Sequence, residues 1–208
     1  MVIPASGFRL PASIVMSNAE TRKKAASARL EQIRAKSAPF PPKEEKSCRF
    51  AADVMLGRLA KWLRIAGFDV LYSNKFSDNE LISLSNREKR ILLSRDTRLL
   101  VRKSVQCFIY LESEKIQDQL KQVMEALGQT CLPSLLTRCL SCNEALIEAP
   151  RECVHHRVPA FVFKTQSHFK SCPRCGKIFW AGTHRTSVLR TLENLMQKNA
   201  TDSTDFAV

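Results

Sequence analysis

The spacing of hydrophobic and polar positions changes near residue 49, and from there it predicts alternating strands and helices. Apolar residues recur at helical spacing in 55–67, 77–90, 95–103 and 113–128. Short apolar runs without polar alternation lie at 49–53, 68–73, 91–94 and 106–111. Strands of that kind indicate a sheet buried on both faces. The pattern therefore predicts an α/β domain over residues 49–130, with a parallel sheet flanked by helices.

Residues 1–48 differ from this domain and look like an appendage. Residues 17–36 are polar and rich in alanine, which favours a helix with too few apolar positions to be stable alone. Three prolines in 37–47 then end it. We interpret 1–48 as a basic, largely flexible segment. A nucleic-acid-binding arm and an organellar targeting segment are the alternatives.

Two Cys-x-x-Cys pairs follow the predicted α/β domain, and 29 residues separate them. Four thiolates are the preferred ligand set of structural zinc, and they leave no coordination position open for catalysis. No export signal precedes them, and neither pair joins a strand to a helix as redox pairs do, so metal is favoured over disulfides. The predicted ligands are Cys139, Cys142, Cys172 and Cys175. With a strand expected at 158–164, they predict a zinc ribbon over 131–184, followed by a C-terminal helix and tail over 185–208.

The overall charge narrows the choice of partner. The chain holds 33 Lys and Arg against 20 Asp and Glu, a net charge of +13, which favours a polyanion such as RNA. No apolar run reaches the length of about 18 residues that a membrane span needs, so no membrane partner is expected. The cysteine usage predicts a reducing, cytoplasmic location, with organellar targeting as the alternative.

Three aspartates are candidates for chemistry. Asp53 ends the first predicted strand, Asp78 opens the helix after the second, and Asp96 follows the third. Ligands of parallel sheets gather at the carboxyl ends of the strands, and clustered carboxylates suit Mg²⁺ or Mn²⁺. Each of these residues also precedes a helix, where aspartate is an ordinary N-cap. Position alone leaves catalysis and capping equally open.

Basic residues lie near the same predicted edge. Arg95 and Arg98 flank Asp96, while Arg58, Lys61 and Arg64 recur every three residues along 55–67. As phosphate contacts they would position an RNA backbone without reading its sequence. The alternative is that they form a solvated helix face.

The segments "DVMLGRLAKWLRIAGFDVLY", "SDNELISLS", "RILLSRDTRLL", "CLSCN" and "CPRCGKIFWAGTHRTSVLRTLENL", in that order, resemble the Mut-seven carboxy-terminal RNase domain family. That family is a branch of the PIN-like nucleases with an appended zinc ribbon. The resemblance implies a PIN-like metal-dependent ribonuclease in which Asp53, Asp78 and Asp96 bind the catalytic ion. It also implies a fourth acid, for which Glu80 and Glu112 are the candidates.

The sequence therefore favours two functions. The first is a ribonuclease that hydrolyses phosphodiester bonds with Mg²⁺- or Mn²⁺-activated water, with Lys170, Arg174 and Lys177 of the ribbon helping to hold the RNA. The second is a non-catalytic RNA-binding adaptor in which the carboxylates only cap helices. A zinc-ribbon transcription accessory protein is a weaker third possibility, because a ribbon of that kind needs no α/β partner.

Overall fold

The computed structural model describes residues 12–37, 48–127 and 135–180. Its centre is a four-stranded parallel sheet with the order β2-β1-β3-β4. The strands are β1 Arg49–Ala52, β2 Asp69–Tyr72, β3 Ile91–Ser94 and β4 Phe108–Tyr110. The helices that alternate with them are the 3₁₀ turn η1 Val54–Leu56, α2 Gly57–Ile65, α3 Asp78–Arg87, α4 Thr97–Leu100 and α5 Ile116–Leu127. The predicted parallel α/β fold is confirmed.

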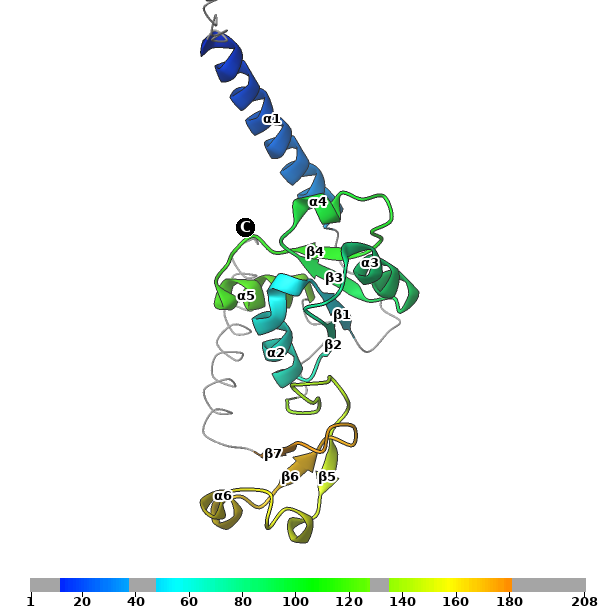
Figure 1. The fold of residues 1–208 in the computed structure, drawn as a ribbon, viewed down its shortest axis with the longest axis vertical. Helices are drawn as coiled ribbons and strands as arrows, with labels where there is room; N and C mark the ends of the chain where they lie inside the picture. The colour runs from blue at the N-terminus through cyan, green and yellow to red at the C-terminus, as the bar shows by residue number, and fades with distance from the viewer. Residues whose placement is uncertain (1–11, 38–47, 128–134, 181–208) are drawn as a thin grey trace, which may run out of the picture.

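Helices cover both faces of the sheet (Figure 1). Because successive strand residues point to opposite faces, Phe50 and Ala52 join the core beneath α2 and α5, whereas Ala51 faces α3 and α4. The same alternation sends Leu93 to the first core and Leu92 to the second. β1 and β3 are thus apolar on both sides, which is why their sequences show no polar alternation.

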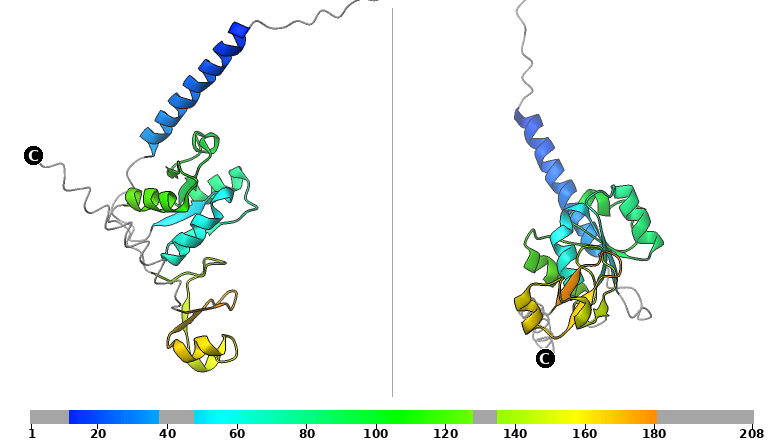
Figure 2. Two further views of the ribbon diagram at one scale, coloured as in Figure 1. Left: turned by 90° about the vertical axis from the view of Figure 1, so that its left-hand side faces the viewer. Right: turned by 60° about the horizontal axis from the view of Figure 1, so that its bottom comes forward.

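The amino-terminal helix α1, Ala12–Lys36, extends away from the α/β domain and contacts it at its carboxyl end (Figure 2). Ile33 is 1% exposed and lies in the core formed with α3 and α4. Arg34 Nε donates to Glu112 Oε1 at 2.9 Å. Lys24 to Arg29 are exposed. Among the side chains described in this helix, Ile33 and Arg34 therefore join it to the domain.

The ribbon is a separate antiparallel sheet of β5 Ile147–Ala149, β6 Phe169–Ser171 and β7 Ile178–Trp180, in that order. Its small core contains Val154, Val158 and Phe169. The predicted strand at 158–164 is wrong, because Ala160–Thr165 forms helix α6. Pro159 occupies its N-cap, and Phe163 N donates to Pro159 O at 2.9 Å, so the segment closes a helical turn instead of extending beside β5 or β7.

Two further predictions concern the C-terminal helix and membrane-spanning segments. The predicted C-terminal helix within 185–208 lies outside the described residues. Among the residues that are described, no helix combines the length and the apolarity that crossing a membrane requires.

Candidate functional site

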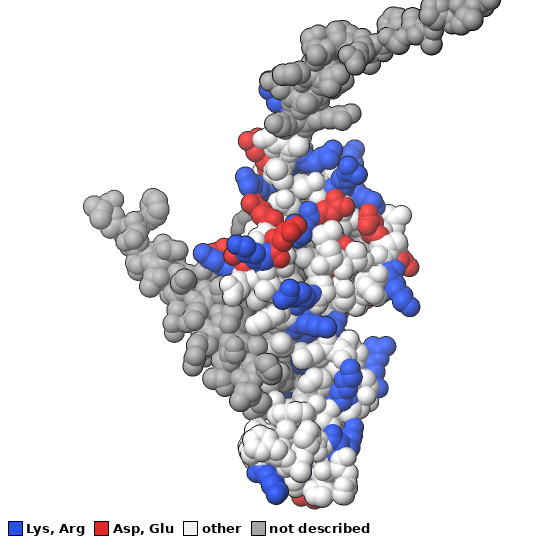
Figure 3. Space-filling model, turned by 60° about the vertical axis from the view of Figure 1, so that its left-hand side comes forward, with Lys and Arg blue, Asp and Glu red and all other residues white. Residues whose placement is uncertain are grey.

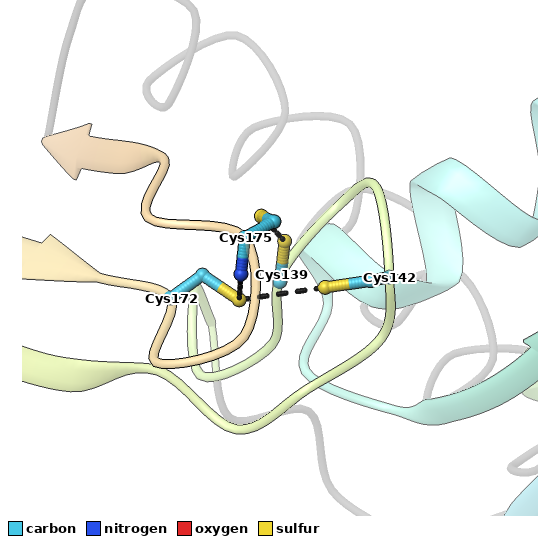
Figure 4. Close-up of side chains that lie close together, drawn as sticks. All are labelled: Cys139, Cys142, Cys172 and Cys175. Carbon is cyan, nitrogen blue, oxygen red and sulfur yellow. Dashed lines mark hydrogen bonds between the residues drawn. The ribbon is translucent and has the colours of Figure 1, made fainter.

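The four predicted zinc ligands meet at one point between the ribbon and the α/β domain (Figure 4). Their sulfur atoms all lie within 4.8 Å of one another. Cys139 Sγ is 3.6 Å from Cys175 Sγ, and Cys142 Sγ is 3.4 Å from Cys172 Sγ. A tetrahedral zinc ion with Zn–S bonds of about 2.3 Å separates its sulfurs by about 3.8 Å. The cluster therefore has the size and the ligand type of a structural zinc site.

The two Cys-x-x-Cys turns have the same backbone design. In the first turn Cys139 N donates to Glu144 O and Asn143 N donates to Cys139 O, at 2.8 and 2.9 Å. In the second turn Lys177 and Gly176 provide the corresponding atoms for Cys172, at 3.0 and 2.9 Å. The fourth residue after each first cysteine is left-handed, with φ of 67° at Asn143 and 70° at Gly176. Asparagine and glycine are the residues that tolerate this conformation best.

The thiols of the site differ in how readily they ionise. Burial raises the pKa of the Cys142 thiol, and its contact with Cys172 raises it further, to about 12. Burial also raises the pKa of Cys172, but hydrogen bonds from Cys175 N and the Cys142 thiol outweigh it and lower the pKa to about 7. A metal ion must therefore displace at least one firmly held proton at neutral pH.

Outside this cluster, Cys48 is disulfide-bonded, so the preference for metal over disulfides does not extend to that residue.

The first zinc turn is fastened to the amino-terminal edge of the parallel sheet. Asn143 Oδ1 accepts from Val70 N at 2.9 Å, and its Nδ2 donates to Asp69 Oδ1 at 2.7 Å. Asp69 Oδ1 also accepts from Arg90 Nη1 at 2.6 Å. Burial raises the pKa of Asp69, but the hydrogen bonds from Arg90 and Asn143 outweigh it and lower the pKa. The cysteine cluster thus supports the amino-terminal edge of the sheet, opposite to the edge where the acids were predicted.

Arg64 belongs to this junction, so it is not available as an RNA contact. Its side chain is 4% exposed; Nε and Nη2 donate to Val70 O, and Nη1 donates to Leu140 O at 3.0 Å. Steps of three residues fall short of a helical turn, so Arg64 lies about 120° around the helix from Arg58. Arg58 and Lys61 are exposed. The predicted basic stripe is therefore reduced to these two residues.

At the carboxyl edge of the sheet, Ser94 connects two of the three predicted acids. Ser94 Oγ donates to Asp53 Oδ2 at 2.5 Å and accepts from Asp96 N at 2.9 Å. Asp53 is 5% exposed and Ser94 is fully buried, whereas Asp96 is half-buried. We call Asp53, Ser94 and Asp96 the acid rim. Both carboxylates also cap helices, since Asp53 Oδ1 accepts from Val54 N and Asp96 Oδ1 from Arg98 N.

The remaining predicted acids are engaged elsewhere. Asp78 Oδ2 accepts from Arg102 Nη2 at 2.6 Å, and Glu112 is paired with Arg34. Glu80 closes a capping box with Ser77, and hydrogen bonds from the Ser77 backbone and hydroxyl lower its pKa. Within the described part of the chain, the cysteine cluster is the only set of three or more potential ligands close enough to share an ion. The expected cluster of three carboxylates is therefore not formed.

The basic residues beside the acid rim differ in how available they are to bind a phosphate. Arg98 is exposed, whereas Arg95 Nη2 donates to Glu114 Oε1 at 2.7 Å. Arg95 Nε is buried without a hydrogen-bond partner. Because Glu114 is 82% exposed, solvent screens this ion pair and a phosphate can compete for the guanidinium.

Sequence reasoning missed two residues of these sites, Ser94 and Asp69. Ser94 could have been recognised as a polar residue that ends an apolar strand two positions before Asp96. Asp69 offered no such signal, because its role depends on Asn143, which is 74 positions away in the chain.

Comparison with known proteins gave one result. The family model described as the Mut7-C RNAse domain matches residues 48–192, which include both the acid rim and the four cysteines. No curated protein and no solved structure matches the chain.

Proposed function

Since the chain belongs to the Mut7-C RNase domain family, we propose that it is a metal-dependent ribonuclease whose acid rim hydrolyses RNA phosphodiester bonds. The observation that supports this most strongly is the bridge made by Ser94 between Asp53 and Asp96. It ties the Asp53 carboxylate to the backbone of Asp96, so that residues from two strand ends meet at the edge where parallel sheets bind their ligands.

The donor set of the acid rim suits a small hard cation. Each carboxylate oxygen that accepts one hydrogen bond keeps a further lone pair, and Mg²⁺ is commonly held by one or two carboxylates together with substrate phosphates and water. Asp53 and Asp96 would hold the ion without a third acid. When bound, Mg²⁺ or Mn²⁺ supplies charge neutralisation at the phosphate and a water molecule of lowered pKa.

The chain's own residues orient the acids and bind the RNA phosphates. Ser94 fixes the orientation of the Asp53 carboxylate and the backbone of Asp96. Arg98, and Arg95 once it leaves Glu114, would bind the phosphates on either side of the scissile bond. Asp78 would contribute only if its ion pair with Arg102 opened, so we assign it a smaller role than Asp53 and Asp96.

A cleavage assay tests this proposal. Purified protein that retains zinc is incubated with RNA and Mn²⁺, beside the Asp53→Asn and Asp96→Asn variants. Glu125→Gln is the matched control, because it removes a carboxylate from the exposed face of α5, where its only described partner is Lys121. Cleavage should depend on Mn²⁺, fall at least a hundredfold in both aspartate variants and persist in Glu125→Gln. Equal cleavage by all four proteins would reject the proposal.

The second candidate is the RNA-binding adaptor without catalysis. It is favoured by one observation, that both rim carboxylates accept backbone hydrogen bonds as helix caps. In that case Asp53→Ala and Asp96→Ala would lower stability by about 1 kcal/mol each, whereas the asparagine variants would keep the cap hydrogen bonds. RNA would be bound in a salt-dependent manner, and no Mn²⁺-dependent product would form.

A further inference from the structure

The ribbon sheet has a second face, opposite to its core, and that face is lined by one row of aligned side chains. Phe169 is buried in the ribbon core, so its neighbour Lys170 points to the other side. Lys170 is in register with Glu148 on β5 and with Phe179 on β7. These three residues form a floor that runs across all three strands.

A pocket of about 320 Å³ lies on this floor. Leu135 and Leu136, from the segment that leads into the ribbon, form one side of the pocket. His168 and Trp180 complete the lining. Its volume falls within the range of small-molecule sites. The lining sets the Phe179 ring beside the Lys170 ammonium and the His168 imidazole, so it suits a flat ligand with a negative charge beside it. Trp180 borders the pocket and, in register with Phe169, packs against the ribbon core.

The charge around the pocket favours a polyanion. Residues 131–184 carry seven Lys and Arg against three acidic residues. Lys170 Nζ lies 3.7 Å from Glu148 Oε1, and the Glu148 side chain is 73% exposed, so this pair is weak and leaves the ammonium accessible. On the face shown in Figure 3, Lys and Arg continue from the α/β domain down the ribbon, whereas acidic side chains gather on the α/β domain.

We propose that this pocket binds an unstacked base of single-stranded RNA, with Lys170 on the adjoining phosphate. Aromatic rings on a sheet face bind bases of single strands in this way, whereas a duplex keeps its bases stacked and paired. This inference rests on the proposed ribonuclease function, because it names single-stranded RNA as the class of substrate. Helix α2 spans about 13 Å between the acid rim and the zinc turn, so the same strand would reach the rim along the exposed Arg58 and Lys61.

Binding is measured by the anisotropy of a labelled oligouridylate, with zinc retained and no Mg²⁺ or Mn²⁺ added. Phe179→Ala should weaken binding about tenfold, because alanine substitution removes one base–ring stack. Phe179→Leu, which keeps an apolar side chain but no ring, should weaken it similarly while preserving the fold. Phe161→Ala is the matched control, since Phe161 is 74% exposed on α6 and does not line the pocket. Lys164→Ala is the corresponding control for Lys170→Ala.

A second readout uses the fluorescence of Trp180, which borders the pocket. The chain has two tryptophans, so Trp62→Phe leaves Trp180 as the only tryptophan that emits. Oligouridylate should quench it, whereas an RNA duplex should not. The proposal is overturned if Phe179→Leu binds as wild type does, if the controls weaken binding equally, or if Phe179→Ala lowers the melting temperature with unchanged affinity. Because no cleavage is measured, these outcomes are independent of whether the acid rim hydrolyses RNA.

Discussion

At the scale of single residues, the acid rim depends on Ser94 as much as on the acids. Its hydroxyl holds the buried Asp53 carboxylate and the Asp96 backbone at once. Residues that orient metal ligands typically change affinity or activity by about 10- to 100-fold when they are replaced. We predict a loss of that size in kcat/KM for Ser94→Ala, measured with Mn²⁺. Ser94→Thr, which keeps the hydroxyl, should recover most of it; an alanine variant as active as wild type would show that the bridge is irrelevant.

Asp69 is the corresponding residue at the opposite edge of the sheet. Asp69→Asn leaves the 9%-exposed Arg90 without its closest charged partner, so we predict a loss of about 2 kcal/mol in the free energy of unfolding in urea. The lowered pKa of Asp69 means that its contribution is present at neutral pH and disappears as the pH falls through that pKa. Glu125→Gln, on an exposed i,i+4 pair, should change stability by less than about 0.5 kcal/mol. Equal effects of the two variants would contradict this assignment.

At the scale of elements, the two zinc turns should bind metal in a strongly pH-dependent manner. Cys142 holds its proton far above neutral pH, while the pKa of Cys172 is about 7. Each proton that zinc displaces makes the affinity fall about tenfold per pH unit as the pH decreases. Competition with a chromophoric chelator between pH 8 and pH 6 should show at least this slope. An affinity that does not change over this range would mean that the thiols are not the ligands.

The sequence predicted elements better than it predicted contacts between them. The strands and helices of the α/β domain follow from apolar runs and helical spacing, and α3 begins with a capping box of Ser77 and Glu80. The error at 158–164 arose because a short apolar run fits a strand or a helix equally well, and only Pro159 pointed to the helix. The contacts of Arg64 and Asp78 were missed for another reason. Their partners, Leu140 O and Arg102, lie 76 and 24 positions away, and no local pattern reveals them.

At the scale of the whole molecule, the cysteine cluster and the acid rim lie at opposite edges of one sheet. Zinc should therefore govern stability, and the rim should govern chemistry. We predict that Cys142→Ser loses zinc and melts at a lower temperature, because the turn that carries Asn143 and Leu140 no longer holds Val70 and Arg64. Asp53→Asn should keep its full zinc content and melt within a few degrees of wild type. Metal analysis and thermal unfolding measure both, and loss of zinc in Asp53→Asn would contradict the separation.

The most direct test of the account is Mn²⁺ binding to the acid rim, followed by electron paramagnetic resonance with zinc retained. Wild-type protein and Glu125→Gln should both bind Mn²⁺, while Asp53→Asn and Asp96→Asn should each weaken that binding at least tenfold. Mn²⁺ bound with equal affinity by all four proteins, or by none of them, would contradict the claim that these two carboxylates form a hydrolytic metal centre.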